Sequence, residues 1–173
     1  MKSRYAFLVA EDDENDVFFL TRAFQQAKIE NPLHVVRDGQ EAIEYLSGLG
    51  KFSDRIEYPL PHLFILDLKM PRKTGLDVLG WLHEQPELRC LPVVVLSSSA
   101  QRTDIEKAYE LGANGFVVKP ASVEKRVEMA KVIGAFWLDL NEGPIVSTEG
   151  LEAARKLRQE RGGQKSDGEE DQT

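Results

Sequence analysis

The stretch LFILDLKMP, residues 63–71, shows most directly what kind of fold this chain adopts. Four apolar residues in a row are followed by an acid and a turn sequence, a pattern typical of a strand buried on both faces in a parallel sheet covered by helices. Asp67 stands at the carboxyl end of this strand, the edge where ligands and reacting groups gather in open α/β sheets. Asp67 is therefore a candidate reactive group, although an Asp that only starts a turn would give the same local pattern.

The composition limits the classes of protein to consider. A chain of 173 residues with 42% hydrophobic residues has room for one full core and a modest extension. The net charge of −7 argues against broad binding to DNA or to anionic membranes, because phosphate groups favour clustered Lys and Arg. Cys90 is the single cysteine, and no apolar run reaches the roughly 20 residues of a membrane span or resembles a signal peptide. We therefore expect a cytoplasmic protein that contacts neither DNA nor membrane.

Four further apolar runs, each followed by a helical pattern, accompany this strand along the chain. The runs are residues 5–10, 33–37, 91–97 and 115–118. The last helix is predicted to begin at Ser122 and to reach about Leu140. Five βα units in succession favour a parallel sheet with helices on both faces.

Polar residues follow four of the five predicted strands. They are Glu11, Asp12 and Asp13, then Asp67, then Ser97, then Lys119. Because the carboxyl ends of parallel strands meet at one edge, residues over a hundred positions apart can come together there. Carboxylates bind hard cations such as Mg²⁺, while an amine and a hydroxyl can contact phosphoryl oxygens. The set matches acyl phosphate chemistry at an aspartate.

The motifs AEDD, ILDLKMP, VVVLSSS and FVVKP, in this order, resemble the receiver domain of two-component response regulators over about residues 4–140. The resemblance implies a flavodoxin-like (βα)5 fold with strand order 2-1-3-4-5. It also implies that Asp67 accepts a phosphoryl group from a histidine of a sensor kinase. The protein would then be a signalling component, not an enzyme acting on a separate substrate.

The resemblance further assigns roles to single residues. Mg²⁺ would be held by Asp67, Asp12 and the backbone carbonyl of Lys69, with Glu11 acting through water. Ser97 and Lys119 would contact the phosphoryl group. Phe116 would turn inward as the switch aromatic, where many relatives carry Tyr, and a plain core role for Phe116 is the alternative. The bond between Lys119 and Pro120 resembles the cis peptide of the family.

The predicted last helix is apolar on more than one side, so something besides the sheet should cover it. We expect a homodimer through this helix, with the alternative that the carboxy-terminal extension folds back over it. Together with the long Gly48–His62 connection, which is either a binding surface or an insertion, the helix end resembles the small receivers that serve bacterial phytochromes.

These features predict a receiver domain over residues 1–140, an extension over 141–161 that can form a short helix, and a disordered acidic tail over 162–173. With little chain after the receiver, output is expected to pass through an unidentified downstream protein.

Two other classes of protein share parts of this pattern. A pseudo-receiver is a binding module of the same fold that is not phosphorylated, and it would lack the acceptor, metal-binding or lysine residues, all of which are present here. An aspartate-nucleophile phosphohydrolase also uses Asp and Mg²⁺. Such enzymes usually carry a second Asp two residues after the nucleophile as acid and base, and that position is Lys69.

Overall fold

The computed structural model of the protein describes residues 5–143 and Lys156. Apart from Lys156, the predicted extension helix and acidic tail beyond Gly143 lie outside the described residues. Within the described part of the chain, no helix is both long enough and apolar enough to cross a lipid bilayer.

In this part of the chain, five parallel strands form one sheet in the order β2-β1-β3-β4-β5. The strands are β1 (Phe7–Ala10), β2 (Leu33–Val36), β3 (Leu63–Leu66), β4 (Val93–Ser97) and β5 (Gly115–Val118). This confirms the predicted flavodoxin-like architecture and its strand order. The first strand is shorter than predicted, because the register pairs Phe7 with Leu33 and Leu63 and leaves the preceding residues beyond the ladder.

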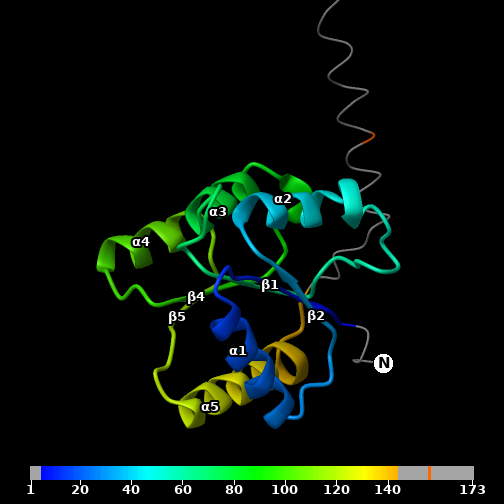
Figure 1. Cartoon of the computed structure of the whole chain (residues 1–173). Helices are drawn as coiled ribbons and strands as arrows, with labels where there is room; N and C mark the ends of the chain where they lie inside the picture. Colours follow the sequence, from blue (N-terminus) through cyan, green and yellow to red (C-terminus); the bar gives the residue numbers. More distant parts are fainter. Residues whose placement is uncertain (1–4, 144–155, 157–173) are drawn as a thin grey trace, which may run out of the picture.

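Helices cover both faces of the sheet: α2, α3 and α4 lie on one face, and α1 and α5 on the other (Figure 1). The helices are α1 (Glu14–Gln26), α2 (Gly39–Ser47), α3 (Gly75–His83), α4 (Arg102–Glu110) and α5 (Val123–Gly134). Four of them begin at a side chain that accepts hydrogen bonds from amides of the first turn. These caps are Asp13, Asp38, Thr74 and the predicted Ser122. Each cap satisfies amide groups that have no partner inside the helix.

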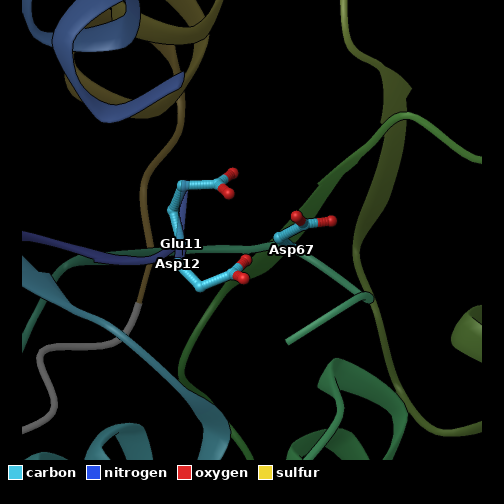
Figure 2. Close-up of side chains that lie close together, drawn as sticks. All are labelled: Glu11, Asp12 and Asp67. Atoms are coloured by element: carbon cyan, nitrogen blue, oxygen red, sulfur yellow. The ribbon is translucent and has the colours of Figure 1, made fainter. Parts of the chain in front are cut away.

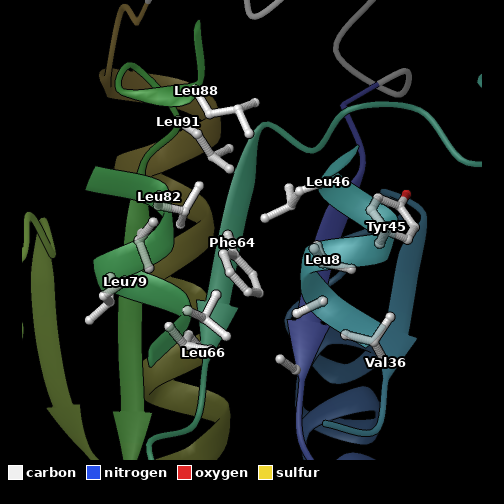
Figure 3. Close-up of a cluster of buried hydrophobic side chains, with 14 of the residues drawn as sticks. Leu8, Val36, Tyr45, Leu46, Phe64, Leu66, Leu79, Leu82, Leu88 and Leu91 are labelled. Atoms are coloured by element: carbon white, nitrogen blue, oxygen red, sulfur yellow. The ribbon is translucent and has the colours of Figure 1, made fainter. Parts of the chain in front are cut away.

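Strand β3 forms the centre of both hydrophobic cores. Phe64 and Leu66 point into the core under α2 and α3 (Figure 3), whereas Leu63 and Ile65 point into the core under α1 and α5. All four side chains are almost fully buried. Burying each contributes roughly 1.5–3 kcal/mol, and the strand therefore holds Asp67 on a rigid base.

The last helix has an apolar side that the described residues do not cover. Ile133 packs on the sheet, while Val132, Phe136 and Leu140 are exposed. The helix reaches Leu140 as predicted, but its final part, η4 (Ala135–Leu140), is a π-helix. The prediction of an apolar surface on more than one side is confirmed for this part of the chain.

The long Gly48–His62 connection is held to the rest of the domain by the side chain of Arg55. The guanidinium of Arg55 donates hydrogen bonds to the carbonyls of Tyr45, Leu46 and Tyr58, which ties the loop to the end of α2. Gly48 takes a left-handed conformation with φ 67° at that helix end, where residues with a side chain are strained.

The peptide bond before Pro120 differs from the expectation. The described residues contain no cis peptide bond, so the expected cis form of the Lys119-Pro120 bond is wrong in this structure. The trans form is the ordinary preference even before proline. In this arrangement the carbonyl of Pro120 accepts a hydrogen bond from Arg126 Nε at 2.9 Å.

Candidate functional site

The carboxyl ends of β1, β3 and β5 bring charged side chains into contact, as the strand pattern predicts. Lys119 follows β5, and its Nζ lies 3.0 Å from Asp67 Oδ2, although the two residues are 52 positions apart. Strand pairing places the two strand ends along one edge, because the amide of Lys119 donates to the carbonyl of Ser97 and the amide of Asp67 donates to that of Ala10. The predicted meeting of Asp67 and Lys119 is therefore present in the structure.

Lys119 contacts two more carboxylates. Its Nζ lies 2.7 Å from Glu11 Oε2 and 2.8 Å from Asp16 Oδ2. An ammonium group has three donors, so these two contacts and Asp67 use its whole hydrogen-bonding capacity. Burial alone would lower the pKa of Lys119, but the hydrogen bonds to Asp16 and Glu11 and the charge of Asp67 outweigh it and raise this pKa. Lys119 therefore stays charged.

Glu11 is the most strongly perturbed acid of the site. Burial raises the pKa of Glu11 to about 7, the charge of Asp67 acts in the same direction, and the hydrogen bond from Lys119 acts against it. Burial is the larger effect because only 4% of Glu11 is exposed. A second cation beside this carboxylate would therefore be strongly favoured.

Three carboxylates form a group that can hold a metal ion. Glu11, Asp12 and Asp67 each offer an oxygen, and these oxygens lie within 4.8 Å of one another (Figure 2). Glu11 and Asp67 are buried, while Asp12 is exposed and opens the group to solvent. Carboxylate oxygens are the ligands that Mg²⁺ and Mn²⁺ prefer. The donor set therefore fits a hard divalent cation.

The backbone around Asp67 fixes its carboxylate. Asp67 Oδ1 accepts a hydrogen bond from the amide of Leu68 at 2.7 Å. The start of α3 packs directly behind it: a Cβ on Gly75 would lie 2.2 Å from the carbonyl oxygen of Asp67. Only glycine allows this close approach. The turn after β3 is thus held by its own hydrogen bond to Asp67 and by the close packing of α3 at Gly75.

Three other residues were predicted to belong to the site: Ser97, Phe116 and Lys69. Ser97 ends β4 and is fully buried, and its Oγ accepts a hydrogen bond from the amide of Ser99. Phe116 in β5 is partly buried against the core under α2, α3 and α4. Lys69 is exposed, two residues after Asp67.

Sequence reasoning missed two residues, Asp16 and Arg126. Asp16 joins Lys119 through Oδ2 and Arg126 Nη1 through Oδ1, the latter at 3.1 Å. Asp16 lies in the first turn of α1 and Arg126 in the first turn of α5, and no spacing in the sequence relates the two. Burial alone would raise the pKa of Asp16, but the hydrogen bonds and charges of Lys119 and Arg126 outweigh it and lower this pKa.

A second ion pair lies beside the site. Arg72, in the turn after β3, contacts Asp38 Oδ2 through Nη2 at 2.6 Å and through Nε at 2.8 Å. Asp38 Oδ1 also accepts from the amide of Glu41 at 2.8 Å. Next to it the amide of Gly39 donates to the carbonyl of Lys73, and a Cβ on Gly39 would lie 2.3 Å from that oxygen. These contacts join the turns that follow β2 and β3.

Comparison with known proteins identifies the family. Residues 7–131 match the response regulator receiver domain. The chain is 32% identical over 132 residues to response regulator Rcp1 of Synechocystis sp., which covers 76% of this chain and 88% of Rcp1.

Several solved structures are similar to this chain. The structure of the phosphorylated cyanobacterial phytochrome response regulator RcpA has a TM-score of 0.76 and 32% identity, over 82% of this chain and 99% of RcpA. The bacteriophytochrome response regulator RtBRR has a TM-score of 0.66 and 38% identity, over 92% and 96%. A Mn²⁺-bound form of Rcp1 has a TM-score of 0.73 and 30% identity, over 82% and 99%. With this match over most of its length, the chain belongs to the response regulator receiver family of two-component signalling.

Proposed function

We propose that this receiver domain accepts a phosphoryl group on Asp67 from a histidine of a sensor kinase. The observation that carries the proposal is the contact of Lys119 Nζ with Asp67 Oδ2 at 3.0 Å beside two further carboxylates. A carboxylate oxygen of Asp67 attacks phosphorus, a P–O bond forms, and the P–N bond breaks with its electron pair returning to the imidazole nitrogen. Lys119 holds positive charge where a phosphoryl oxygen would lie.

The residues that would hold Mg²⁺ are Glu11, Asp12, Asp67 and the backbone carbonyl of Lys69. Their support is the oxygen-only donor set and the Mn²⁺-bound form of the related Rcp1. When bound, the cation neutralises negative charge on the acids and on the phosphoryl oxygens. Glu11 and Asp67 directly follow the paired strand ends Ala10 and Leu66, which keeps the two acids side by side.

Ser97 and Phe116 are proposed to report phosphorylation to the rest of the domain. Ser97 is buried at the end of β4, so its hydroxyl can turn from the amide of Ser99 towards a new phosphoryl oxygen. Phe116 lies on the neighbouring strand and is only partly buried, which leaves it room to move further inward. A phenyl ring has no hydroxyl, so this switch works by packing alone.

The kinase partner is proposed to be a phytochrome-type sensor. RcpA is described as a cyanobacterial phytochrome response regulator and RtBRR as a bacteriophytochrome response regulator, and this chain is similar to both over most of its length. Phosphotransfer profiling against a panel of sensor histidine kinases tests this assignment. Faster transfer from a kinase without a phytochrome sensor region would contradict it.

We further propose a homodimer through α5 and η4, within a receiver that ends near residue 140. Val132, Phe136 and Leu140 expose apolar surface on the side away from the sheet. A second copy would cover the same surface on both partners by twofold symmetry. Size-exclusion chromatography at high micromolar concentration should show a dimer that Val132→Lys and Leu140→Lys together convert to a monomer. A monomeric wild type would overturn the proposal.

The phosphoacceptor assignment is tested with acetyl phosphate and Mg²⁺, read by intact mass. Wild type should gain one phosphoryl group and Asp67→Asn none. Asp13→Asn is the matched control, because Asp13 is an exposed neighbour that caps α1 and Asn caps equally well. Equal labelling of Asp67→Asn and wild type would refute the assignment. An unlabelled wild type that still binds a kinase would favour the pseudo-receiver.

A further inference from the structure

We propose that Asp16 is a positioning residue: it keeps the ammonium of Lys119 in place when a cation engages the carboxylates of Glu11 and Asp67, so that the ammonium is ready for the incoming phosphoryl group. The proposal rests on the proposed phosphoacceptor function and adds a residue and a helix to it. It follows from which of the three partners of Lys119 belong to the metal-binding group.

Two of the three partners of Lys119 are expected to change their charge on activation. Glu11 and Asp67 belong to the group of acids that fits a divalent cation, and Asp67 is also the proposed acceptor. A cation beside these carboxylates competes directly with the ammonium for their oxygens. The attraction that now holds Lys119 to these two carboxylates therefore weakens once a cation is bound and before a phosphoryl group arrives.

Asp16 is the partner that stands outside the metal-binding group. It comes from the first turn of α1, and its Oδ2 lies 2.8 Å from Lys119 Nζ. About a quarter of the Asp16 side chain is exposed, compared with 6% for Glu11 and Asp67. The contact with Asp16 thus remains available when the other two carboxylates are engaged.

Arg126 holds Asp16 in the orientation that this contact needs. Its Nη1 lies 3.1 Å from Asp16 Oδ1, so the two oxygens of one carboxylate are divided between the two cations. Arg126 Nε donates to the carbonyl of Pro120, the residue after Lys119, at 2.9 Å. The guanidinium also lies over the ring of Phe19, at 5.3 Å from its centroid. Arg126 therefore fixes Asp16 and the chain next to Lys119 at the same time.

A purely structural role for Asp16 makes different predictions. In that case the carboxylate would only join α1 to α5, and its loss would lower the melting temperature without changing the chemistry of a folded molecule. If Asp16 positions Lys119, its loss should slow phosphorylation without changing Mg²⁺ affinity. Its loss should also free the Lys119 ammonium to move and to exchange its protons with water.

The test compares Asp16→Asn with Glu14→Gln in the full chain. Glu14 is an exposed acid in the same first turn of α1, so the control removes an equal charge from the same helix end. We expect Asp16→Asn to slow labelling by acetyl phosphate roughly tenfold and Glu14→Gln to label at the wild-type rate. Mg²⁺ affinity should stay within about twofold in both variants, because neither residue is a proposed ligand.

A spectroscopic measurement reads the ammonium directly. Hydrogen-bonded ammonium groups exchange protons slowly with water and give ¹⁵N-correlated NMR signals. The signal of Lys119 is assigned by its loss in Lys119→Met. With saturating Mg²⁺ it should persist in wild type and Glu14→Gln and disappear in Asp16→Asn. A signal that persists in Asp16→Asn, or labelling of this variant at the wild-type rate, would overturn the inference.

Arg126→Gln provides a second variant that leaves all carboxylates in place. It should slow labelling by roughly threefold, and the double variant with Asp16→Asn should be no slower than Asp16→Asn alone, because Arg126 acts through Asp16. If the two substitutions slowed labelling additively, Arg126 would not act through Asp16. If wild type itself is not labelled, the proposed function fails, whereas the NMR measurement still decides whether Asp16 holds Lys119.

Discussion

Two groups of charged side chains lie at the same edge of the sheet and differ in how their charges balance. Around Lys119, one ammonium faces the carboxylates of Glu11, Asp16 and Asp67. Within the described part of the chain, only Asp16 has a second cation, Arg126. A few residues away, Asp38 and Arg72 form a pair of one acid and one base. The first group has a surplus of buried negative charge, whereas the second is neutral as it stands.

The difference separates a group that can take up a ligand from one that only holds the fold. The surplus of negative charge around Lys119 favours binding of a divalent cation. It also lowers the stability of the metal-free domain, because burying acids without enough positive charge costs free energy. The pair of Asp38 and Arg72 gains nothing from a further ion and instead joins two turns beside the site. Proximity to the site therefore does not by itself indicate a role in its chemistry.

The largest loss of stability is expected for Lys119→Met. Without the ammonium, three carboxylates lose their common partner, and we expect about 3 kcal/mol less stability at pH 8 in metal-free buffer. Because the pKa of Glu11 is raised above its unfolded value, the folded state binds more protons between these values, so stability falls as pH rises through about 7.

Chemical denaturation at pH 6 and pH 8, with and without millimolar Mg²⁺, checks this prediction. Lower pH and added Mg²⁺ should each restore stability to Lys119→Met. Lys107→Met, the same change at an exposed position of α4, is the control. A variant as stable as wild type at pH 8 without Mg²⁺ would show that the surplus of charge is not costly.

Asp12→Ala tests whether the acids near Lys119 bind Mg²⁺. Removing this carboxylate leaves two acids in the group, and we expect Mg²⁺ affinity to fall at least tenfold, which corresponds to about 1.4 kcal/mol. Isothermal titration with Mg²⁺ measures the change. Glu14→Ala, which removes a nearby exposed acid, should bind Mg²⁺ as wild type does. Unchanged affinity in Asp12→Ala would mean that the ligands are wrongly assigned.

Asp38→Ala tests the neutral pair of Asp38 and Arg72. Loss of the cap of α2 and of the contact with Arg72 should cost about 1 kcal/mol at pH 7 and leave Mg²⁺ affinity unchanged. Burial works to raise the pKa of Asp38, but the amide of Glu41 and the guanidinium of Arg72 hold this pKa below its usual range.

A lowered pKa gives stability that is present above the unfolded value and lost as pH falls through the folded one. The difference between wild type and Asp38→Ala, measured by urea unfolding, should therefore shrink in acid below a pH of about 3.9. A constant difference from pH 7 down to pH 2 would contradict this account.

The smallest effect is expected for Arg102→Gln. Arg102 and Glu106 form a surface pair one turn apart on α4, with 90% and 57% of the side chains exposed. Such pairs contribute little, so the free energy of unfolding should change by no more than about 0.5 kcal/mol. A larger loss in the same urea experiments would mean that burial does not explain why the group around Lys119, the pair of Asp38 and Arg72 and the pair of Arg102 and Glu106 differ in their contribution to stability.

Much of the fold was predictable because strand patterns are local. The run from Leu63 to Leu66 is apolar on both faces, and the structure buries both faces in separate cores. The π-helical end of the last helix was not predictable, since residues 135–140 are as apolar and as helix-forming as those before them. The trans bond before Pro120 was also missed, because a family resemblance does not fix the conformation of a single peptide bond.

The candidate site was predictable where its residues follow strands. Glu11, Asp67 and Lys119 meet because parallel pairing alone brings the strand ends together. Asp16 and Arg126 lie on helices, so their meeting depends on how α1 and α5 pack, which no short sequence pattern states.

The pairing of β1 with β3 has a consequence for how long the site keeps its shape. The amide of Asp67 donates to the carbonyl of Ala10, directly before Glu11, at 3.0 Å, so the spacing of the acids is set by the innermost ladder of the sheet. In deuterated solvent this amide should exchange only through global opening, among the slowest protons of the molecule. The acids then keep their spacing for as long as the molecule stays folded.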